Sequence, residues 1–314
     1  MQHLKKWKLP WLMIVVLPLL LAARAADAQS SDKDAKAAQS AAAPTDTKNS
    51  ADQSQYAGSE ACKTCHDEKF KGFGESPHWM TTQETKMTHG ARGCESCHGP
   101  GQAHIDGGGD KSKIFTFKGA KTDDITKACL SCHESKVAQR EFMRSPHHDN
   151  GVSCISCHSI HESNREYLLT QKQPELCYSC HREQRADFQK TFRHRVNEGL
   201  IKCTDCHDAH GTLRDRQVRA APNQDIICTK CHADKRGPFV FEHEPVRVEG
   251  CLACHTPHSS VYPRMLLTAR VNTLCLQCHE QIPTGPHSQN LARQSCIICH
   301  MSIHGSNVSN IFFK

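Results

Sequence analysis

Ten copies of one short arrangement of cysteine and histidine occur in this chain of 314 residues. In each copy two cysteines stand three positions apart and a histidine follows directly, as in Cys203-Thr-Asp-Cys206-His207. Two thiols at this spacing can form thioether bonds to the two vinyl groups of a haem, and the adjacent histidine can bind its iron. All 20 cysteines are used in this way. The pattern therefore predicts ten covalently attached c-type haems.

Zinc knuckles and disulfides use the same cysteine spacing. Neither requires a histidine directly after the second cysteine in every copy, whereas thioether attachment with a proximal histidine ligand does. We therefore interpret all ten copies as haem sites and number them 1 to 10 in chain order. Each site, given as its two cysteines and its proximal histidine, is in turn Cys62, Cys65 and His66; Cys94, Cys97 and His98; Cys129, Cys132 and His133; Cys154, Cys157 and His158; Cys177, Cys180 and His181; Cys203, Cys206 and His207; Cys228, Cys231 and His232; Cys251, Cys254 and His255; Cys275, Cys278 and His279; Cys296, Cys299 and His300.

Ten further histidines stand at recurring distances from these sites and are predicted to be the second, distal iron ligands. The next histidine is far along the chain after an odd-numbered site and near after an even-numbered one, so the unit of construction is two sites, a repeat of roughly 50 residues. The far histidines are His78, His147, His194, His243 and His287, and the near histidines are His104, His161, His210, His258 and His304.

The supply of histidines nearly equals the number needed for ten bis-histidine irons. Of 23 histidines, only His3, His89 and His148 are left over. His148 adjoins His147, so either could be the ligand, and we expect His89 not to bind iron. A near histidine could instead hydrogen-bond a haem propionate, but the sites would then lack ligands.

The near histidines at position +3 cannot close their own iron. Two axial histidines hold their Cα atoms roughly 12–13 Å apart, from metal–nitrogen bonds of about 2 Å and two ring lengths. Three residues of extended chain reach at most about 11 Å. The simplest exchange lies within a pair of sites, so we expect His210 to serve site 5 and His194 to serve site 6.

An iron with two protein ligands has no open position for a substrate, so these sites predict electron transfer rather than catalysis. The pentahaem nitrite reductases mark their active haem with lysine in place of the motif histidine, and this chain has histidine at all ten sites. No triad, P-loop or dinucleotide-binding motif offers another catalytic centre. The alternative is a multihaem periplasmic reductase with one open haem site.

Protein side chains alone are too few to form the cores of a chain this long. Hydrophobic residues make up 37 %, with the 20 cysteines among them, and aromatic residues 6 %. Such a composition buries too little apolar surface to offset chain entropy. We therefore expect the porphyrins to be the core, wrapped by short helices and long loops with little regular secondary structure.

Residues 1–28 have the layout of a cleavable signal peptide, with lysines, about 13 apolar residues and then small residues. Residues 29–57 are rich in Ala, Ser, Asp, Gln and Lys and are predicted to be a disordered linker. The formal charge of +6 includes a net +3 within the signal. The remaining basic residues are scattered, so nucleic acid is not an expected partner.

From Cys62 onward the chain resembles the periplasmic decahaem c-type cytochromes of the MtrA/DmsE/PioA family. The order of the motifs, the C-terminal segment and several connecting segments agree with that family. One departure is Ser259-Ser260, where the family leads us to expect Gly-Ser. The segments that carry the resemblance are CHGPGQAH (97–104), HHDN (147–150) before CISCHSIH (154–161), CHADKRGPFVFEHEPV (231–246), CLACHTPHSS (251–260) and CIICHMSIHGSN (296–307).

The resemblance implies an elongated haem wire made of two pentahaem halves, which we place at 58–200 and 201–314. It also implies a periplasmic location and association with the outer membrane, because the family's wire inserts in an outer-membrane β-barrel protein. The implied partners are that barrel, a periplasmic or inner-membrane c-type cytochrome donor, and an outer-surface multihaem cytochrome or terminal reductase. Extracellular respiration is the implied role.

Overall fold

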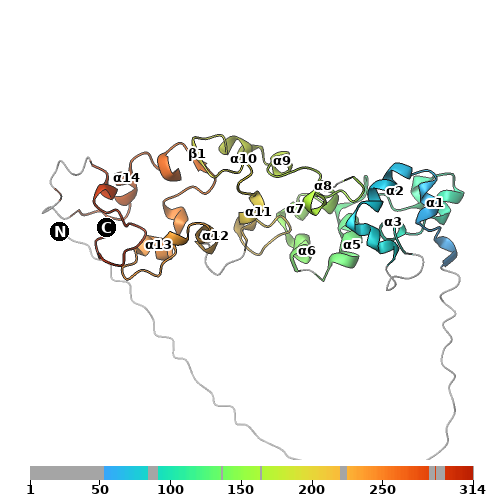
Figure 1. Ribbon diagram of the computed structural model, residues 1–314, viewed down its shortest axis with the longest axis horizontal. Coiled ribbons are helices and arrows are strands. Elements are labelled where there is room, and N and C mark those ends of the chain that lie inside the picture. The colour runs from blue at the N-terminus through green and yellow to red at the C-terminus, as the bar shows by residue number, and fades with distance from the viewer. Residues whose placement is uncertain are drawn as a thin grey trace, which may run out of the picture. The chain divides into compact units, whose positions relative to one another are not determined.

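The computed structural model describes residues 53–83, 91–135, 137–162, 165–219, 225–282, 287 and 294–313. All of them belong to one compact unit, Thr47–Lys314. The predicted signal peptide and residues 29–52 of the predicted linker lie outside the described residues. Within the unit the elements follow one another in chain order, from α1–α3 at one end to α13 and α14 at the other (Figure 1).

Secondary structure consists of short helices and very little sheet, which confirms the predicted fold class. The α-helices are α1 (Ser59–Lys63), α2 (Asp67–Gly74), α3 (Glu95–His98), α4 (Gln102–Asp106), α5 (Thr122–His133), α6 (Val137–Glu141), α7 (Pro146–Asp149), α8 (Cys154–Cys157), α9 (Glu175–Tyr178), α10 (Arg182–Asp187), α11 (Cys203–Cys206), α12 (Asp225–Thr229), α13 (Glu244–Val248) and α14 (Val271–Cys275). The 3-10 turns are η1 (Gln53–Gln55), η2 (Pro77–Thr82), η3 (Lys111–Lys113), η4 (Phe142–Arg144), η5 (Glu166–Leu168), η6 (Asp215–Gln217), η7 (Ala233–Lys235), η8 (Cys251–Ala253), η9 (Pro263–Met265) and η11 (Cys296–Ile298).

The cysteine motifs themselves account for many of these short helices. In nine of the ten motifs the backbone N–H of the histidine donates to the carbonyl of the first cysteine at 2.9–3.0 Å. The remaining motif, that of site 3, forms the end of helix α5. Each motif is therefore one helical turn, which brings both thiols and the histidine to the same place.

One two-residue strand pair ties distant parts of the chain together. Strand β1 (Phe192–Arg193) pairs antiparallel with β2 (Ser259–Ser260), with Phe192 opposite Ser260 and Arg193 opposite Ser259. The backbone N–H of His194 extends this pairing by donating to the carbonyl of His258 at 3.2 Å. Two predicted distal ligands thus sit on adjoining backbones.

Buried hydrophobic side chains are few in the described part of the chain. They are Phe73, Ile125, Phe142, Tyr178, Phe188 and Val196. Tyr178, Phe188 and Val196 form one cluster, against which Ile201 and Cys203 pack. This is the sparse protein core that the composition predicts.

A buried carboxylate anchors the start of the folded unit. Glu95 is 2 % exposed, and its carboxylate accepts backbone N–H bonds from Ala57, Gly58 and Gly101 at 2.7–2.9 Å. Such charge-assisted bonds satisfy the buried charge. Residues 53–57, the end of the predicted linker, therefore contact the folded unit.

No helix within the described ranges is both long and apolar enough to cross a bilayer.

Candidate haem-binding sites

Every motif histidine has its ring opposite the ring of one other histidine. The ten pairs have ring centres 5.9–6.4 Å apart, and all ten second members are histidines predicted as distal ligands. In order of sites 1 to 10 the pairs are His66–His104, His98–His161, His133–His78, His158–His210, His181–His147, His207–His258, His232–His194, His255–His304, His279–His243 and His300–His287.

The spacing of the rings fits one iron between each pair. A bis-histidine iron needs ring centres about 6.2 Å apart, from two metal–nitrogen bonds of about 2.0 Å and about 1.1 Å between each nitrogen and its ring centre. The ring planes are within 7–18° of parallel at sites 1, 2, 4, 8, 9 and 10. They are inclined by 55–73° at sites 3, 5, 6 and 7. The residues present therefore suit haem iron.

The partners are exchanged between neighbouring pairs of sites, and the expected exchange within a pair is wrong. His210 faces His158 of site 4 rather than site 5, and His194 faces His232 of site 7 rather than site 6. No +3 histidine faces the motif histidine that it follows, as the limit on chain reach requires.

A simple rule describes the exchange. A far histidine serves the odd-numbered site two places ahead, and a near histidine serves the even-numbered site two places behind. The ends of the series depart from this rule because they lack a neighbour. His104 faces site 1, and His287 faces site 10.

Backbone carbonyls orient the motif histidines at all five even-numbered sites. The Nδ1 atoms of His158, His207 and His255 each donate to a carbonyl nine residues further along, at 2.8 Å. Because a carbonyl only accepts, Nδ1 carries the proton and Nε2 is left to bind metal. His98 and His300 make the same bond to the carbonyls of Phe115 and Ile311, at 2.8 and 2.6 Å.

Three of the residues that offer these carbonyls have an unusual backbone. Tyr167, Arg216 and Arg264 have φ of 57°, 55° and 59°, and the residue after each also has a positive φ. The left-handed region costs a non-glycine residue about 1 kcal/mol or more. Three copies of the same strained turn, each placing a carbonyl on a motif histidine, indicate that holding the ring offsets this cost.

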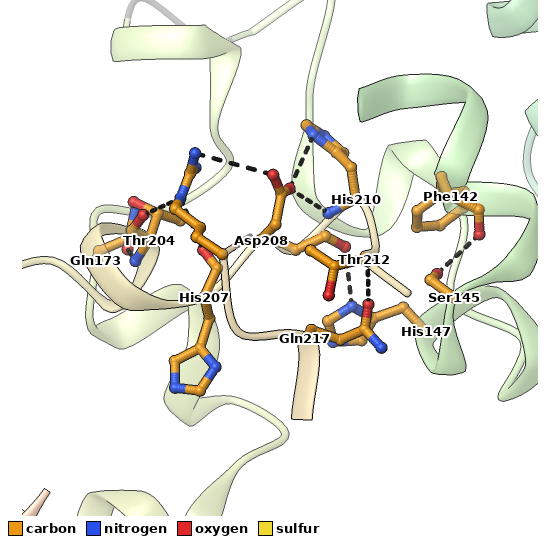
Figure 2. A network of polar contacts seen from close by, with 12 residues as sticks. Phe142, Ser145, His147, Gln173, Thr204, His207, Asp208, His210, Thr212 and Gln217 are labelled. Carbon is orange, nitrogen blue, oxygen red and sulfur yellow. Dashed lines mark hydrogen bonds and ion pairs between the residues drawn. The ribbon is translucent and has the colours of Figure 1, made fainter. Parts of the chain in front are cut away.

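Three far histidines are attached to the backbone that carries a near histidine. His147 Nδ1 donates to the carbonyl of Ala209 at 3.0 Å, and His194 Nδ1 donates to that of Pro257. The carbonyl of Ile303 accepts from His243 in the same way. Each of these carbonyls immediately precedes a near histidine. The ligands of sites 4 and 5, 6 and 7, and 8 and 9 are therefore held as units, the first of which lies around His147 and His210 in Figure 2.

Burial keeps several distal imidazoles neutral. It lowers the pKa of His78, His161, His210, His243, His258 and His304 below the usual value for histidine. Only the neutral imidazole can bind a metal ion. The surroundings of these rings therefore favour the form that a ligand requires.

Comparison with known proteins finds multihaem c-type cytochromes. The family model described as doubled CXXCH motif matches residues 147–186, 194–237 and 243–284, and the model described as cytochrome c554 and c-prime matches 23–99 and 106–159. The chain is 33 % identical over 274 residues to the multiheme cytochrome MtrA of Shewanella baltica (strain OS185), covering 80 % of this chain and 79 % of that protein. The chain belongs to the MtrA family of multihaem c-type cytochromes. It is also 26 % identical over 144 residues to the cytochrome c-type protein NrfB of Escherichia coli O6:H1, covering 46 % of this chain and 65 % of that protein.

This MtrA-type cytochrome binds c-type haem and transfers electrons, and its cysteines are ordered for that task. As free thiols, before haem attachment, the first cysteines of sites 1 and 2 are hydrogen-bonded to each other, which raises the pKa of Cys62 and lowers that of Cys94 to about 6. The same contact joins sites 3 and 4, sites 5 and 6, and sites 9 and 10. Between pairs, the second cysteines interact instead, as Cys97 does with Cys132 and Cys157 with Cys180. The attachment points thus follow one another in chain order.

The structure distinguishes His147 from His148 as the candidate ligand of site 5. His147, and not His148, faces the motif histidine of site 5. The ring of His148 lies against the edge of Phe142, and its Nε2 is 3.1 Å from Asp123. His89 lies outside the described residues.

Glycines allow close approach at two of the near histidines. A Cβ on Gly72 of α2 would lie 1.8 Å from the carbonyl oxygen of His161. Gly211, directly after His210, has a φ of 112°, and a Cβ there would meet the carbonyl of Glu141 at 2.9 Å. Backbone-to-backbone packing therefore sets where these ligands stand.

Proposed function

We propose that this cytochrome carries ten haems, each with two axial histidines, and forms a periplasmic electron-transfer conduit. In this proposal it inserts in an outer-membrane β-barrel partner. It then passes electrons between periplasmic carriers and an outer-surface cytochrome or reductase, as in extracellular respiration.

The observation that carries the proposal is the presence of ten histidine pairs at iron-binding distance in chain order. The bound haem supplies one-electron chemistry at its iron. The 20 motif cysteines would hold the porphyrins, the motif histidine of each site would be the proximal ligand, and its facing histidine would be the distal ligand. With both axial positions taken, no substrate can reach the iron, so the sites support electron transfer and not catalysis.

The division into halves at 58–200 and 201–314 is part of the proposal, with five sites in each half. The two halves would not be independent. The pairs His158–His210 and His194–His232 connect residues on both sides of the division. Electrons crossing from one half to the other would therefore pass through sites built by both.

The mass of the intact protein and its carbon monoxide spectrum test the haem count and the class. We expect the mass of the processed chain plus ten haems, with a low-spin spectrum that carbon monoxide does not change. A high-spin haem that binds the gas readily would contradict the proposal and favour a reductase with one open site.

Cell fractionation tests the location and the barrel partner. We expect the cytochrome in the outer-membrane fraction when the barrel gene is present and in the periplasmic fraction when that gene is deleted. Cytochrome that stays with membranes in the deletion strain would show that residues 1–28 are an anchor and not a cleaved signal.

A further inference from the structure

In the described part of the chain, two of the predicted distal histidines face a carboxylate at Nδ1 instead of a backbone carbonyl. Asp208 Oδ1 lies 3.8 Å from the Nδ1 atom of His210, which faces site 4 (Figure 2). Asp187 Oδ2 lies 3.7 Å from the Nδ1 atom of His258, which faces site 6. These distances exceed a direct hydrogen bond, so each carboxylate acts on the ring through its charge.

Both carboxylates are largely shielded from water and fixed in place. The Asp208 side chain is 18 % exposed, and its Oδ1 accepts the backbone N–H of His210 at 3.1 Å. This local turn fixes Asp208 beside the ligand that follows it. Asp187 is 26 % exposed and forms an ion pair with Lys190. Limited exposure preserves the effect of a charge, because water screens it less.

A negative charge beside the outer nitrogen of an imidazole makes that imidazole a stronger donor to the metal. Carboxylate partners of metal-binding histidines act in this way, and such outer contacts are among the means by which a protein sets haem potential. Stronger donation favours the ferric state over the ferrous state. The reduction potential of the iron therefore falls.

We propose that Asp208 and Asp187 lower the reduction potentials of the haems at sites 4 and 6. The inference rests on the bis-histidine ligation of the proposed function. The two aspartates are positioning residues that act through His210 and His258. Site 5 lies between the two sites in chain order, so the middle of the conduit would hold two haems that are harder to reduce on either side of one that lacks this contact in the described structure.

A cation near Asp208 provides a test of sign. Arg219 Nη1 lies 3.8 Å from Asp208 Oδ2, and its Nε donates to the carbonyl of Thr204 at 2.6 Å. The Arg219 side chain is 44 % exposed against 18 % for Asp208, so water screens its charge more strongly. The carboxylate should therefore dominate at His210. Removing either charge should move the potential of site 4, in opposite directions.

The experiment is redox potentiometry of the full holoprotein, followed by electron paramagnetic resonance. The angle between two axial imidazole planes shapes the low-spin ferric signal, because each ring bonds to the iron along one direction. Site 4 has near-parallel rings at 15° and site 6 inclined rings at 55°. Asp208→Asn should shift one near-parallel signal and Asp187→Asn one inclined signal. Each should ease reduction about tenfold, or about 59 mV for one electron.

Matched variants separate charge from structure. Asp208→Glu should retain most of the low potential, and Arg219→Gln should move site 4 to a lower potential than the wild type. Asp215→Asn and Glu183→Gln remove exposed carboxylates from the same loop and from α10, and should shift neither signal. The inference is overturned if the Asn variants behave like these controls or if Arg219→Gln shifts site 4 upward. A wild-type protein without ten low-spin haems would instead overturn the proposed function.

Discussion

Replacing Gly72 with alanine should remove the distal ligand from the iron of site 2, although Gly72 lies on the helix that follows site 1. Gly72 lies on α2, after site 1, but packs on the backbone of His161, whose ring faces His98 of site 2. The alanine Cβ would stand 1.8 Å from the His161 carbonyl oxygen, against a lower limit of 3.0 Å for real contacts. One of the two backbones must therefore move by about 1.2 Å, at a cost of about 1–3 kcal/mol for overpacking.

An iron–nitrogen bond cannot absorb a shift of that size. Metal–ligand distances in proteins stay within about 0.2 Å of their usual values. Relaxation of the chain between the carbonyl and the ring can take up part of the movement, but the remainder weakens or breaks the bond from His161. We expect Gly72→Ala to keep all its haems and to show one high-spin, carbon-monoxide-binding haem at site 2.

The neighbouring glycine provides the control. A Cβ on Gly74 would lie 4.0 Å from Cε3 of the Trp79 ring, which is an ordinary contact. Gly74→Ala should therefore remain low-spin, and the helix should gain up to about 1 kcal/mol. The measurements are intact mass and the carbon monoxide difference spectrum of both variants. If Gly72→Ala matched Gly74→Ala in both, the link from α2 to site 2 would be refuted.

Three further predictions follow from the paired rings. Paramagnetic resonance of the oxidised protein should resolve six near-parallel and four inclined low-spin haems, and a single class would contradict the ring angles. His210→Ala should remove a near-parallel signal, because it serves site 4 at 15°; loss of an inclined signal would mean that it serves site 5, where the rings meet at 73°. Burial lowers the pKa of His161, so below the unfolded value of about 6.5 the unfolded chain binds more protons at this residue than the folded one. The stability linked to this neutral ring is therefore complete above that pH and is lost as the pH falls. In the holoprotein the proton must also displace the iron from the ring, so an acid titration should show a high-spin band that grows only below about pH 6.5.

The sequence predicts the members of the candidate sites well and their partners poorly. The position of each histidine relative to its motif identifies nine of the ten that face a motif histidine in the structure, and it leaves His147 and His148 as alternatives for the tenth. Which motif they face depends on how repeats pack in space, and spacing along the chain does not contain that information. His210 and His158 are 52 residues apart in the chain, and nothing local to either specifies the other.

Some supporting groups could not have been found from sequence in any simple way. Tyr167, Arg216 and Arg264 adopt a left-handed backbone conformation. Glycine or asparagine at these positions would have indicated it, but residues with large side chains give no such signal. Asp208 is visible two residues before His210, but Asp187 reaches His258 across 71 residues. By contrast, the near absence of an apolar core follows directly from composition.

The exchange of ligands between neighbouring pairs also bears on how the protein is assembled. A chain that emerges with its N-terminus first presents site 2 while His161 is still 63 residues behind. If a haem were attached there before the next repeat arrived, it would lack its second ligand, so under the proposed ligation the unfinished chain would carry reactive iron that the finished protein would not. The same logic applies to damage at the other end. Loss of residues 301–314 would leave site 10 with His287 but remove His304, and the exposed iron would appear at site 8, two sites away from the break.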